Sequence, residues 1–261
     1  MEHVLFKERA LSKQRRSIKI KTNERIKPIE RTMPGENKVF KKRSVTPRTE
    51  NQRGYIRAIV ESDIVLCQGP AGSGKTHIAI GMATQFLERG DVDKIVVARP
   101  VLEAGEKIGF LPGDQNQKLD PYIRPIMDEL AYYVSYADIA AMKNANTFEI
   151  VPIGYMRGRT FKNSFVIIDE CQNATFDQIK MILSRLGESS RMVLTGDPLQ
   201  SDLEKRHQGG FEFACELFKH HPEIACIKME STDIVRHRLI SSMMAMWENH
   251  VDKYKSGGIM R

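Results

Sequence analysis

The amino-acid sequence predicts an α/β protein, with a mainly parallel sheet covered by helices on both faces in a three-layer α/β/α domain over residues 51–250. Three observations predict this fold. Short apolar segments alternate with longer segments of helical periodicity, as they do in parallel sheets. The first apolar segment runs into a glycine-rich phosphate-binding motif. A later one, Phe165 to Ile168, is followed directly by two acidic residues.

The domain is expected to begin with a helix over residues 51–63. Its apolar positions are expected to face inward: Ile56, Ile59 and Val60. The helix leads into Ile64 to Gln68, an apolar run short enough for a buried strand. Gln52 and Tyr55 precede that strand at the place where many ATPases recognise adenine. Adenine recognition and plain helix packing are equally good interpretations of these two residues.

The next eight residues fit the motif G-x-x-x-x-G-K-[ST], and they are Gly69, Pro70, Ala71, Gly72, Ser73, Gly74, Lys75 and Thr76. The glycines allow backbone turns that a Cβ would forbid, so that successive N–H groups converge on an anion at the start of the following helix. Lys75 is expected to reach the β- and γ-phosphates, and the Thr76 hydroxyl to bind Mg²⁺. An ordinary glycine-rich turn is the alternative. The flanking strand and a helix from residue 77 to 87 disfavour it.

Further elements are expected in a regular order. Strands are predicted at residues 94–100, 147–152, 191–198 and 224–229. Helices are predicted at residues 121–136, 174–186, 209–219 and 233–250. The last helix carries three expected core residues: Met243, Met246 and Trp247. Two loops stand out, a turn-rich loop at 105–114 and a polar loop at 155–160 that contains two arginines.

Asp169 and Glu170 follow the buried strand and lie more than ninety residues beyond Lys75. Because ligands of open α/β sheets bind at the carboxyl ends of the strands, both acids are expected in the crevice of the phosphate-binding motif. Asp169 is expected to hold the Mg²⁺ shell, and Glu170 to polarise a water for attack on the γ-phosphate. Gln200, just beyond the strand at 191–198, is suited to sensing the γ-phosphate. A surface glutamine in a turn is the alternative.

Charge is distributed unevenly along the chain. Residues 1–50 hold 15 Lys or Arg against 6 Asp or Glu, whereas the whole chain has a net charge of +7. Prolines interrupt this stretch and no periodicity is sustained, so a basic, disordered arm is expected. Contact with nucleic-acid phosphates and a solubilising tail are the two interpretations of the arm. Residues 251–261 are expected to be a frayed tail.

Composition argues against several classes of protein. No apolar run approaches the roughly 18 residues of a membrane span, and the first residues lack the pattern of a secretory signal. We therefore expect a cytoplasmic protein. The 4 cysteines fall at no C-x-x-C spacing, which argues against a zinc site or a disulfide framework.

Several stretches also match a known family. Besides the phosphate-binding loop at 69–76, they are residues 99–114, 120–125, 155–160, 169–173, 195–200 and 234–237. In these segments the chain resembles the PhoH-like proteins, phosphate-starvation-inducible P-loop ATPases of bacteria and phages. The resemblance runs through essentially all of residues 51–250, and the loop at 105–114 is close to diagnostic.

The resemblance implies an ATPase core similar to one RecA-like half of a superfamily 1 helicase, with ATP and Mg²⁺ as ligands and proposed action on RNA. By that likeness Asp169 and Glu170 match the Walker B pair, and Gln172 the glutamine that follows it. Gln200 matches the γ-phosphate sensor, and Gln52 resembles the adenine-reading glutamine. Longer relatives carry a nuclease or KH-like domain that the sequence lacks, and its basic arm is a candidate substitute.

A single core domain leaves the ATP site without the arginines that superfamily 1 helicases take from a second lobe. We therefore predict a ring-like homo-oligomer, a hexamer, in which an arginine of the neighbouring subunit reaches the phosphates. Arg236 is the first catalytic candidate, and Arg157 or Arg159 the next. An ion-pair role within the subunit is the alternative for each.

The leading hypothesis is a Mg²⁺-dependent ATPase that binds, moves along or unwinds single-stranded nucleic acid, with RNA favoured over DNA. One alternative is a small-molecule P-loop kinase, in which Gln172 and Gln200 have no obvious use. The other is a nucleotide-gated oligomeric binding module without helicase activity. Stimulation of ATP hydrolysis by single-stranded polynucleotides separates the first hypothesis from both alternatives.

Overall fold

The computed structural model of the protein describes residues 43–100 and 115–235 and six positions between 239 and 250, without the side chains of residues 115–122 and 206. Several sequence-based expectations lie outside the described residues. They concern most of the basic arm, the loop at 105–114, Arg236 and the tail at 251–261.

The described residues form a six-stranded sheet in which every pair of neighbouring strands is parallel. The strand order is β3-β2-β4-β5-β1-β6. The strands are β1 (Ile64–Gln68), β2 (Lys94–Arg99), β3 (Phe148–Pro152), β4 (Ser164–Ile168), β5 (Arg191–Gly196) and β6 (Ile224–Lys228). All the predicted strands are present, and the parallel α/β fold class is confirmed. Strand β5 lies between β1, which leads into the phosphate-binding motif, and β4, which leads into the acids.

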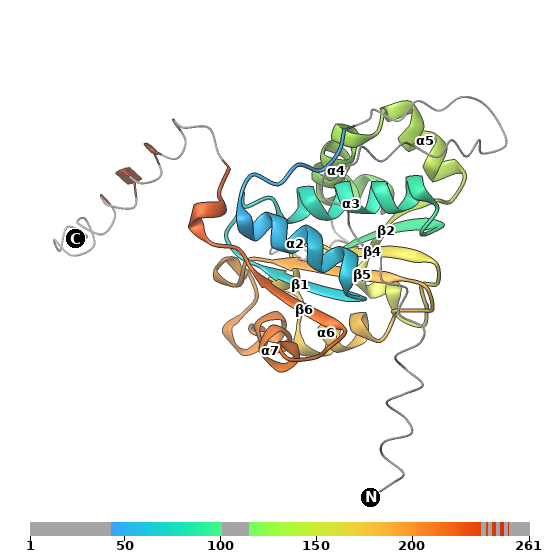
Figure 1. Cartoon of the computed structure of the whole chain (residues 1–261). Helices are drawn as coiled ribbons and strands as arrows, with labels where there is room; N and C mark the ends of the chain where they lie inside the picture. Colours follow the sequence, from blue (N-terminus) through green and yellow to red (C-terminus); the bar gives the residue numbers. More distant parts are fainter. Residues whose placement is uncertain are drawn as a thin grey trace, which may run out of the picture. The chain divides into compact units, whose positions relative to one another are not determined.

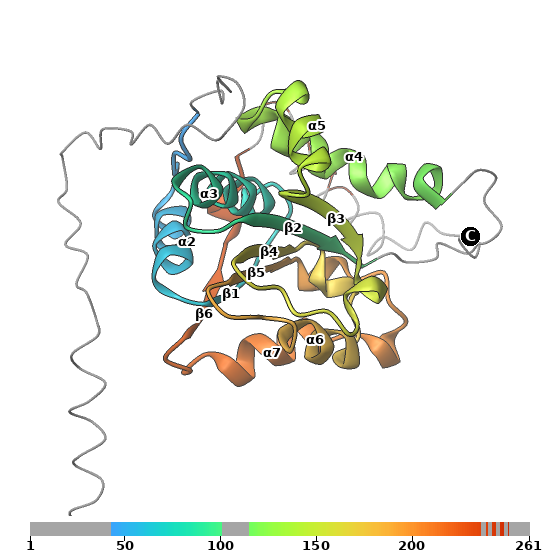
Figure 2. The same ribbon diagram turned by 90° about the vertical axis from the view of Figure 1, so that its right-hand side faces the viewer.

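Helices cover both faces of the sheet, which gives the predicted three layers (Figures 1 and 2). One face is covered by α2 (Glu50–Glu61), α3 (Lys75–Arg89), α4 (Gln115–Tyr133) and α5 (Tyr136–Asn144). The other is covered by α6 (Phe176–Leu183) and α7 (Gly210–Phe218). Short 3₁₀ turns follow several strands, and they are η2 (Ile153–Met156), η3 (Cys171–Asn173), η4 (Pro198–Gln200), η5 (Lys205–His207) and η6 (Ser231–Asp233).

The two layers of helices enclose two separate apolar cores, and alternate residues of each strand enter different cores. In β4, Phe165 and Ile167 pack with α3, whereas Val166 and Ile168 pack with α6 and α7. A strand buried on both faces must be apolar at successive positions, which explains the unbroken apolar run in its sequence. Burying each such side chain contributes on the order of 1.5–3 kcal/mol, and the acids that follow are thereby held at a fixed point at the carboxyl end of β4.

The start of α2 is tied to a distant part of the chain. Thr49 caps the helix by accepting a hydrogen bond from the Gln52 N–H, and Asp233 accepts hydrogen bonds from the Thr49 hydroxyl and the Asn51 amide. Val45 packs against the core beneath α3. Packed structure therefore begins before residue 51, the boundary that the sequence predicts for the domain.

Two sequence-based expectations differ from the structure. The single helix predicted at 121–136 is in fact α4 and α5, because the Ser135 side chain accepts the Asp138 N–H and starts a second helix. Met243, Met246 and Trp247 are not core residues, since their exposed fractions are 54%, 73% and 70%. An apolar stripe at helical spacing shows that a helix has an apolar face, but it does not show what covers that face.

None of the helices in the described ranges has both the length and the apolar character required to cross a bilayer.

Candidate nucleotide-binding site

A pocket lies at the carboxyl ends of β1, β4 and β5, where the sequence places the crevice. It brings together the phosphate-binding loop, both predicted acids and Gln200. The start of α3 and Glu129 of α4 also line the pocket. The lining residues are Ala71, Gly72, Gly74, Lys75, Thr76, His77, Glu129, Asp169, Glu170, Gly196, Asp197 and Gln200.

The phosphate-binding loop has the backbone geometry that its glycines predict. Gly72 and Gly74 have φ values of 81° and 85°, in the left-handed region where a side chain is disfavoured. Gly69 has a different constraint as well, because a Cβ at this position would lie 2.6 Å from the Cβ of Met229. The loop is thus packed closely against the end of β6, and α3 begins directly after it.

Lys75 lies over the loop. Its ammonium group donates hydrogen bonds to the carbonyl oxygens of Gly69 at 2.7 Å and Pro70 at 2.9 Å. Burial lowers the pKa of Lys75, while the nearby charges of Asp197, Glu170 and Asp169 act in the opposite direction. The lysine is therefore a desolvated cation at the point where a phosphate would enter.

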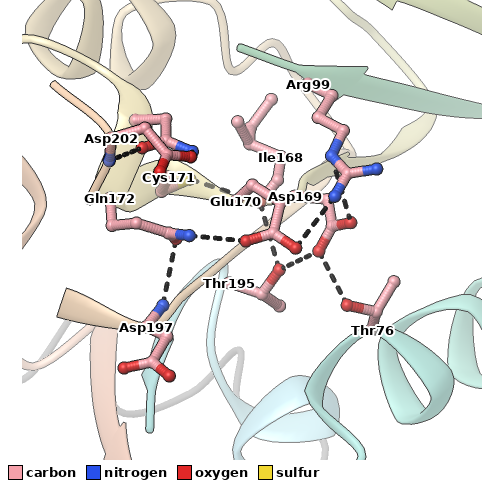
Figure 3. A network of polar contacts seen from close by, with 11 residues as sticks. Thr76, Arg99, Ile168, Asp169, Glu170, Cys171, Gln172, Thr195, Asp197 and Asp202 are labelled. Carbon is pink, nitrogen blue, oxygen red and sulfur yellow. Dashed lines mark hydrogen bonds and ion pairs between the residues drawn. The ribbon is translucent and has the colours of Figure 1, made fainter. Parts of the chain in front are cut away.

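Thr76 and Asp169 meet in the pocket, although one lies in the first turn of α3 and the other follows β4. The Thr76 hydroxyl donates a hydrogen bond of 2.7 Å to Asp169 Oδ1, and the Thr195 hydroxyl of β5 donates to the same oxygen at 2.7 Å (Figure 3). Asp169 is only 5% exposed. Burial raises its pKa, and the charge of Glu170 adds to this effect. A hydroxyl and a carboxylate at this spacing are oxygen ligands that suit Mg²⁺.

Both carboxylate oxygens of Glu170 accept a hydrogen bond from another side chain. Its residue adopts a left-handed backbone conformation with φ 60°, which points the chain into η3. Arg99 Nη2 donates to Glu170 Oε1 at 2.9 Å, and Gln172 Nε2 donates to Oε2 at 2.6 Å. Arg99 also approaches Asp169, with 4.0 Å between Nε and Oδ2. Figure 3 shows the guanidinium beside both carboxylates. The orientation of Glu170 is therefore set by two side chains.

A chain of hydrogen bonds continues from Gln172 to the phosphate-binding loop. Gln172 Oε1 accepts a hydrogen bond of 3.0 Å from the Asp197 N–H. The Asp197 carboxylate in turn accepts the Ala71 N–H at 3.2 Å and, on its other oxygen, the Leu199 N–H at 3.2 Å. Asp197 is 6% exposed. The acids after β4 and the loop after β1 are thus connected through the residue after β5.

Gln200 and Gln52, the two glutamines predicted to contact the nucleotide, lie in different environments. Gln200 is exposed in η4 and lines the pocket. Gln52 is buried beneath the loop, where its Nε2 donates to the Ser73 carbonyl at 3.0 Å and its Oε1 accepts the Arg48 N–H at 2.7 Å. Tyr55 is also buried, and its hydroxyl donates to the Lys75 carbonyl at 3.4 Å. The observed contacts of Gln52 support the loop, and adenine recognition stays a prediction.

The two described arginines of the polar loop also differ. Arg159 forms an ion pair with Glu149 and lies over the ring of Phe161, 4.7 Å from its centre. This is the role within the subunit that the sequence left open. Arg157 is exposed.

Four residues of the site were not predicted from the sequence: Arg99, Asp197, His77 and Glu129. His77 Nδ1 is 2.8 Å from Glu129 Oε2, and its Nε2 is 2.8 Å from the Tyr133 hydroxyl. Arg99 and Asp197 each stand at the carboxyl end of a parallel strand, a position that could have identified them. His77 and Glu129 have no comparable signal, because they meet only when α3 packs on α4.

The sequence profile of the PhoH-like proteins matches residues 44–248. The chain belongs to this family. Among PhoH-like proteins, that of Synechocystis is 42% identical over 204 residues, which are 78% of this chain and 62% of the relative. That of Bacillus subtilis is 41% identical over 208 residues, covering 80% of this chain and 65% of the relative. Protein PhoH of Escherichia coli is 40% identical over 197 residues, covering 75% and 56%. The chain therefore spans less than two thirds of the length of these relatives.

The PhoH-like domain also overlaps with solved structures at low similarity. The SWI2/SNF2 ATPase core of Sulfolobus solfataricus in complex with dsDNA gives a TM-score of 0.43 at 14% identity, covering 79% of this chain and 53% of that one. The UvsW helicase of bacteriophage T4 gives a TM-score of 0.43 at 14% identity, covering 75% and 64%. The family and the site geometry together identify a P-loop NTPase domain.

Proposed function

We propose that this PhoH-like protein is a Mg²⁺-dependent ATPase whose turnover is coupled to single-stranded nucleic acid, with RNA favoured over DNA. The observation that carries the proposal is the 2.7 Å hydrogen bond between Thr76 and Asp169. It joins the hydroxyl of the phosphate-binding motif to the first acid after β4. In P-loop NTPases these two groups hold Mg²⁺, and here Thr76 and Asp169 would hold it.

The residues of the pocket divide the chemistry among them. Thr76 and Asp169 would hold Mg²⁺, which when bound neutralises charge on the phosphates. Lys75 exchanges the carbonyls of its own loop for the β- and γ-phosphates. Glu170 accepts a proton from the water that attacks the γ-phosphorus, while the bond to the β-phosphate oxygen breaks. Gln200, on the exposed rim, donates a hydrogen bond to the γ-phosphate.

The polyanionic partner is supported by charge and by family likeness. The basic residues in excess are concentrated in residues 1–50, and the whole chain carries +7. Contacts of Lys and Arg with phosphates release counterions, so nucleic-acid binding through this stretch weakens as salt rises. The preference for RNA rests on the resemblance to the PhoH-like family. Coupling of ATP hydrolysis to binding, translocation or unwinding of the nucleic acid is the finer part of the proposal.

The experiment is an ATPase titration with single-stranded RNA and DNA homopolymers at low and moderate salt. The hydrolysis rate is expected to rise with polynucleotide, more with RNA than with DNA, and less at higher salt. Lys75→Ala is expected to lose both basal and stimulated rates. If no polynucleotide raises the rate at low salt, the nucleotide-gated binding module replaces this proposal.

A matched pair of variants tests the basic arm. Replacing Lys13, Arg15 and Arg16 by Gln is expected to preserve the basal rate and to flatten the salt dependence of stimulation. Replacing three surface lysines of the folded domain, Lys162, Lys219 and Lys228, removes the same charge elsewhere. An equal loss of stimulation in both variants would show that net charge, rather than the arm, attracts the polynucleotide.

We further propose that a second copy of the chain completes the site within a ring, a hexamer. The exposed Arg157 is the favoured donor among the described residues, since Arg159 is already paired, and Arg236 stays a prediction. Subunits that carry Lys75→Ala or Arg157→Ala are each expected to be inactive alone. When the two variants are mixed in equal amounts, about a quarter of the sites would contain both Lys75 and Arg157, because each interface in a ring joins two different surfaces. No recovery on mixing would contradict an arginine acting in trans.

A further inference from the structure

An anionic side chain of the protein occupies part of the phosphate-binding loop. The Asp197 carboxylate accepts the Ala71 N–H at 3.2 Å, lines the pocket and is almost fully buried. The N–H groups of such a loop are arranged to converge on an anion. Asp197 therefore provides the loop with the kind of group that a phosphate provides, from within the chain.

Lys75 also has its hydrogen-bond partners within the protein. Its ammonium group bonds to the Gly69 and Pro70 carbonyls, and Asp197 is one of the acids whose charge favours the protonated lysine. A cation and an N–H donor that serve phosphates in P-loop proteins thus both have partners in the protein itself. Phosphate binding must exchange these partners rather than simply add to them.

The position of Asp197 indicates which phosphate it meets. It follows β5, three residues before Gln200, and it is joined through Gln172 to Glu170. Gln200 and Glu170 both belong to the γ-phosphate side of the pocket under the proposed function. Asp197 therefore lies on that side of the pocket.

We propose that the Asp197 carboxylate competes with the γ-phosphate of ATP for the Ala71 N–H, so that Asp197 determines how strongly the site distinguishes ATP from ADP. The proposal rests on the proposed ATPase function. The γ-phosphate displaces the carboxylate by offering more charge and more acceptor oxygens at the same N–H group. ADP lacks that phosphate and leaves the Asp197 contact in place.

Displacement of the Asp197 carboxylate also affects Glu170, the proposed catalytic base. The Asp197 N–H donates to Gln172 Oε1 at 3.0 Å, and Gln172 Nε2 holds Glu170 Oε2 at 2.6 Å (Figure 3). A shift of Asp197 away from Ala71 therefore moves an amide that orients Glu170. Gln172 is a positioning residue in this arrangement, and Arg99 holds the other carboxylate oxygen.

Calorimetric titrations with ADP and with a non-hydrolysable ATP analogue test the proposal. Asp197→Asn removes the charge and keeps one acceptor oxygen, which can serve the Leu199 N–H, while its amide nitrogen takes the place of the oxygen that bonds to the Ala71 N–H. The ratio of the ADP dissociation constant to that of the ATP analogue is expected to rise about tenfold, because repulsion between the carboxylate and the γ-phosphate is lost. Asp202→Asn is the matched control, since Asp202 is an exposed acid of the same segment, outside the pocket lining and beside Asn173.

Two results would overturn the proposal. One is an equal change in affinity for both nucleotides. The other is weaker binding of the ATP analogue in Mg²⁺ but not in EDTA, which would place Asp197 in the metal shell instead. Should Asp197→Asn fail to fold, Asp197→Ser retains an acceptor for η4 and gives the same comparison. Wild-type protein that bound neither nucleotide would defeat the ATPase proposal itself, whereas a ratio insensitive to Asp197 would defeat this inference alone.

A second variant tests the link to Glu170. Gln172→Ala is expected to lower kcat about tenfold while leaving KM and the ratio of the two dissociation constants unchanged. A parallel loss of nucleotide affinity would show that Gln172 supports the loop rather than the base, and would contradict the proposed transmission.

Discussion

Strand β2 carries a basic residue at each end, and the two ends have different electrostatics. At the amino end Lys94 Nζ is 2.9 Å from Glu149 Oε2, and Arg159 pairs with the other oxygen of the same carboxylate. At the carboxyl end Arg99 Nη2 is 2.9 Å from Glu170 Oε1 and its Nε is 4.0 Å from Asp169 Oδ2. One acid with two cations thus stands at one end, and two acids with one cation at the other.

The pKa values reflect this difference. Burial tends to raise the pKa of Glu149, but hydrogen bonds from Lys94 and Arg159 outweigh it, and the pKa is lowered. Burial raises the pKa of Asp169, Glu170 raises it further, and Arg99 does not compensate. The amino-end cluster is therefore satisfied within the protein. The carboxyl-end cluster retains excess negative charge that a divalent cation would neutralise, and this distinguishes a ligand site from a structural ion pair.

The largest expected effect is on kcat, and it appears when glutamate is replaced by glutamine in the cluster at each end of β2. Glu170→Gln is expected to lower kcat by about 10²- to 10⁴-fold, because the amide cannot accept a proton from the attacking water. Nucleotide binding should persist, since the phosphate-binding loop is unchanged. Glu149→Gln is the control and should leave kcat near wild type in a steady-state ATPase assay. Full turnover by Glu170→Gln would remove Glu170 from the role of base and erase the functional contrast between the clusters.

A smaller effect is expected at the two basic residues of β2. Arg99→Ala should lower kcat about 10- to 100-fold with little change in KM, because Glu170 loses one of the two groups that orient it. Arg99→Lys should restore part of the rate, since it keeps the charge but not the planar fork. Lys94→Ala, at the other end of the strand, should leave kcat unchanged. A rate unaffected by Arg99→Ala would show that Gln172 alone orients the base.

The smallest effect concerns stability. Glu149→Gln is expected to lower the free energy of unfolding by about 1 kcal/mol at neutral pH, because a partly exposed pair of cations loses its anion. The folded pKa of Glu149 lies below its ordinary value of 4.5. Its contribution is therefore complete above pH 4.5 and is lost as pH falls through the lower, folded pKa.

Denaturant unfolding of wild type and Glu149→Gln at a series of pH values measures this window. The difference between the two proteins should disappear on the acidic side of the series. If the difference in free energy of unfolding stayed constant down to the lowest pH, the packing of the Glu149 side chain, rather than its charge, would account for its contribution to stability.

Much of the fold could be predicted from local patterns. The four inner strands were predictable because strands buried on both faces are short apolar runs, and β4 is the clearest case. The phosphate-binding loop was predictable because glycines at 72 and 74 have the left-handed backbone that the motif needs. The division between α4 and α5 was not, since Val134 continues the apolar spacing and hides the cap at Ser135.

The site was predictable in its parts but not in its connections. Sequence position alone placed Asp169, Glu170 and Gln200 in one crevice, where the structure also has them. The contacts of Arg99 with Glu170 and of Asp197 with Ala71 join segments far apart in the chain. They depend on β2 lying beside β4, and on β5 lying between β4 and β1.

By itself, the sequence determined the family, the strands, most of the helices and the candidate residues for binding phosphate and Mg²⁺, because each follows from patterns among a few neighbouring positions. Only the tertiary structure decided which side chains hold Glu170, that Gln52 supports the loop, and that an aspartate of the chain bonds to the loop's N–H group. Strand order creates those contacts, and burial in the crevice strengthens the interactions between the charges that it brings together.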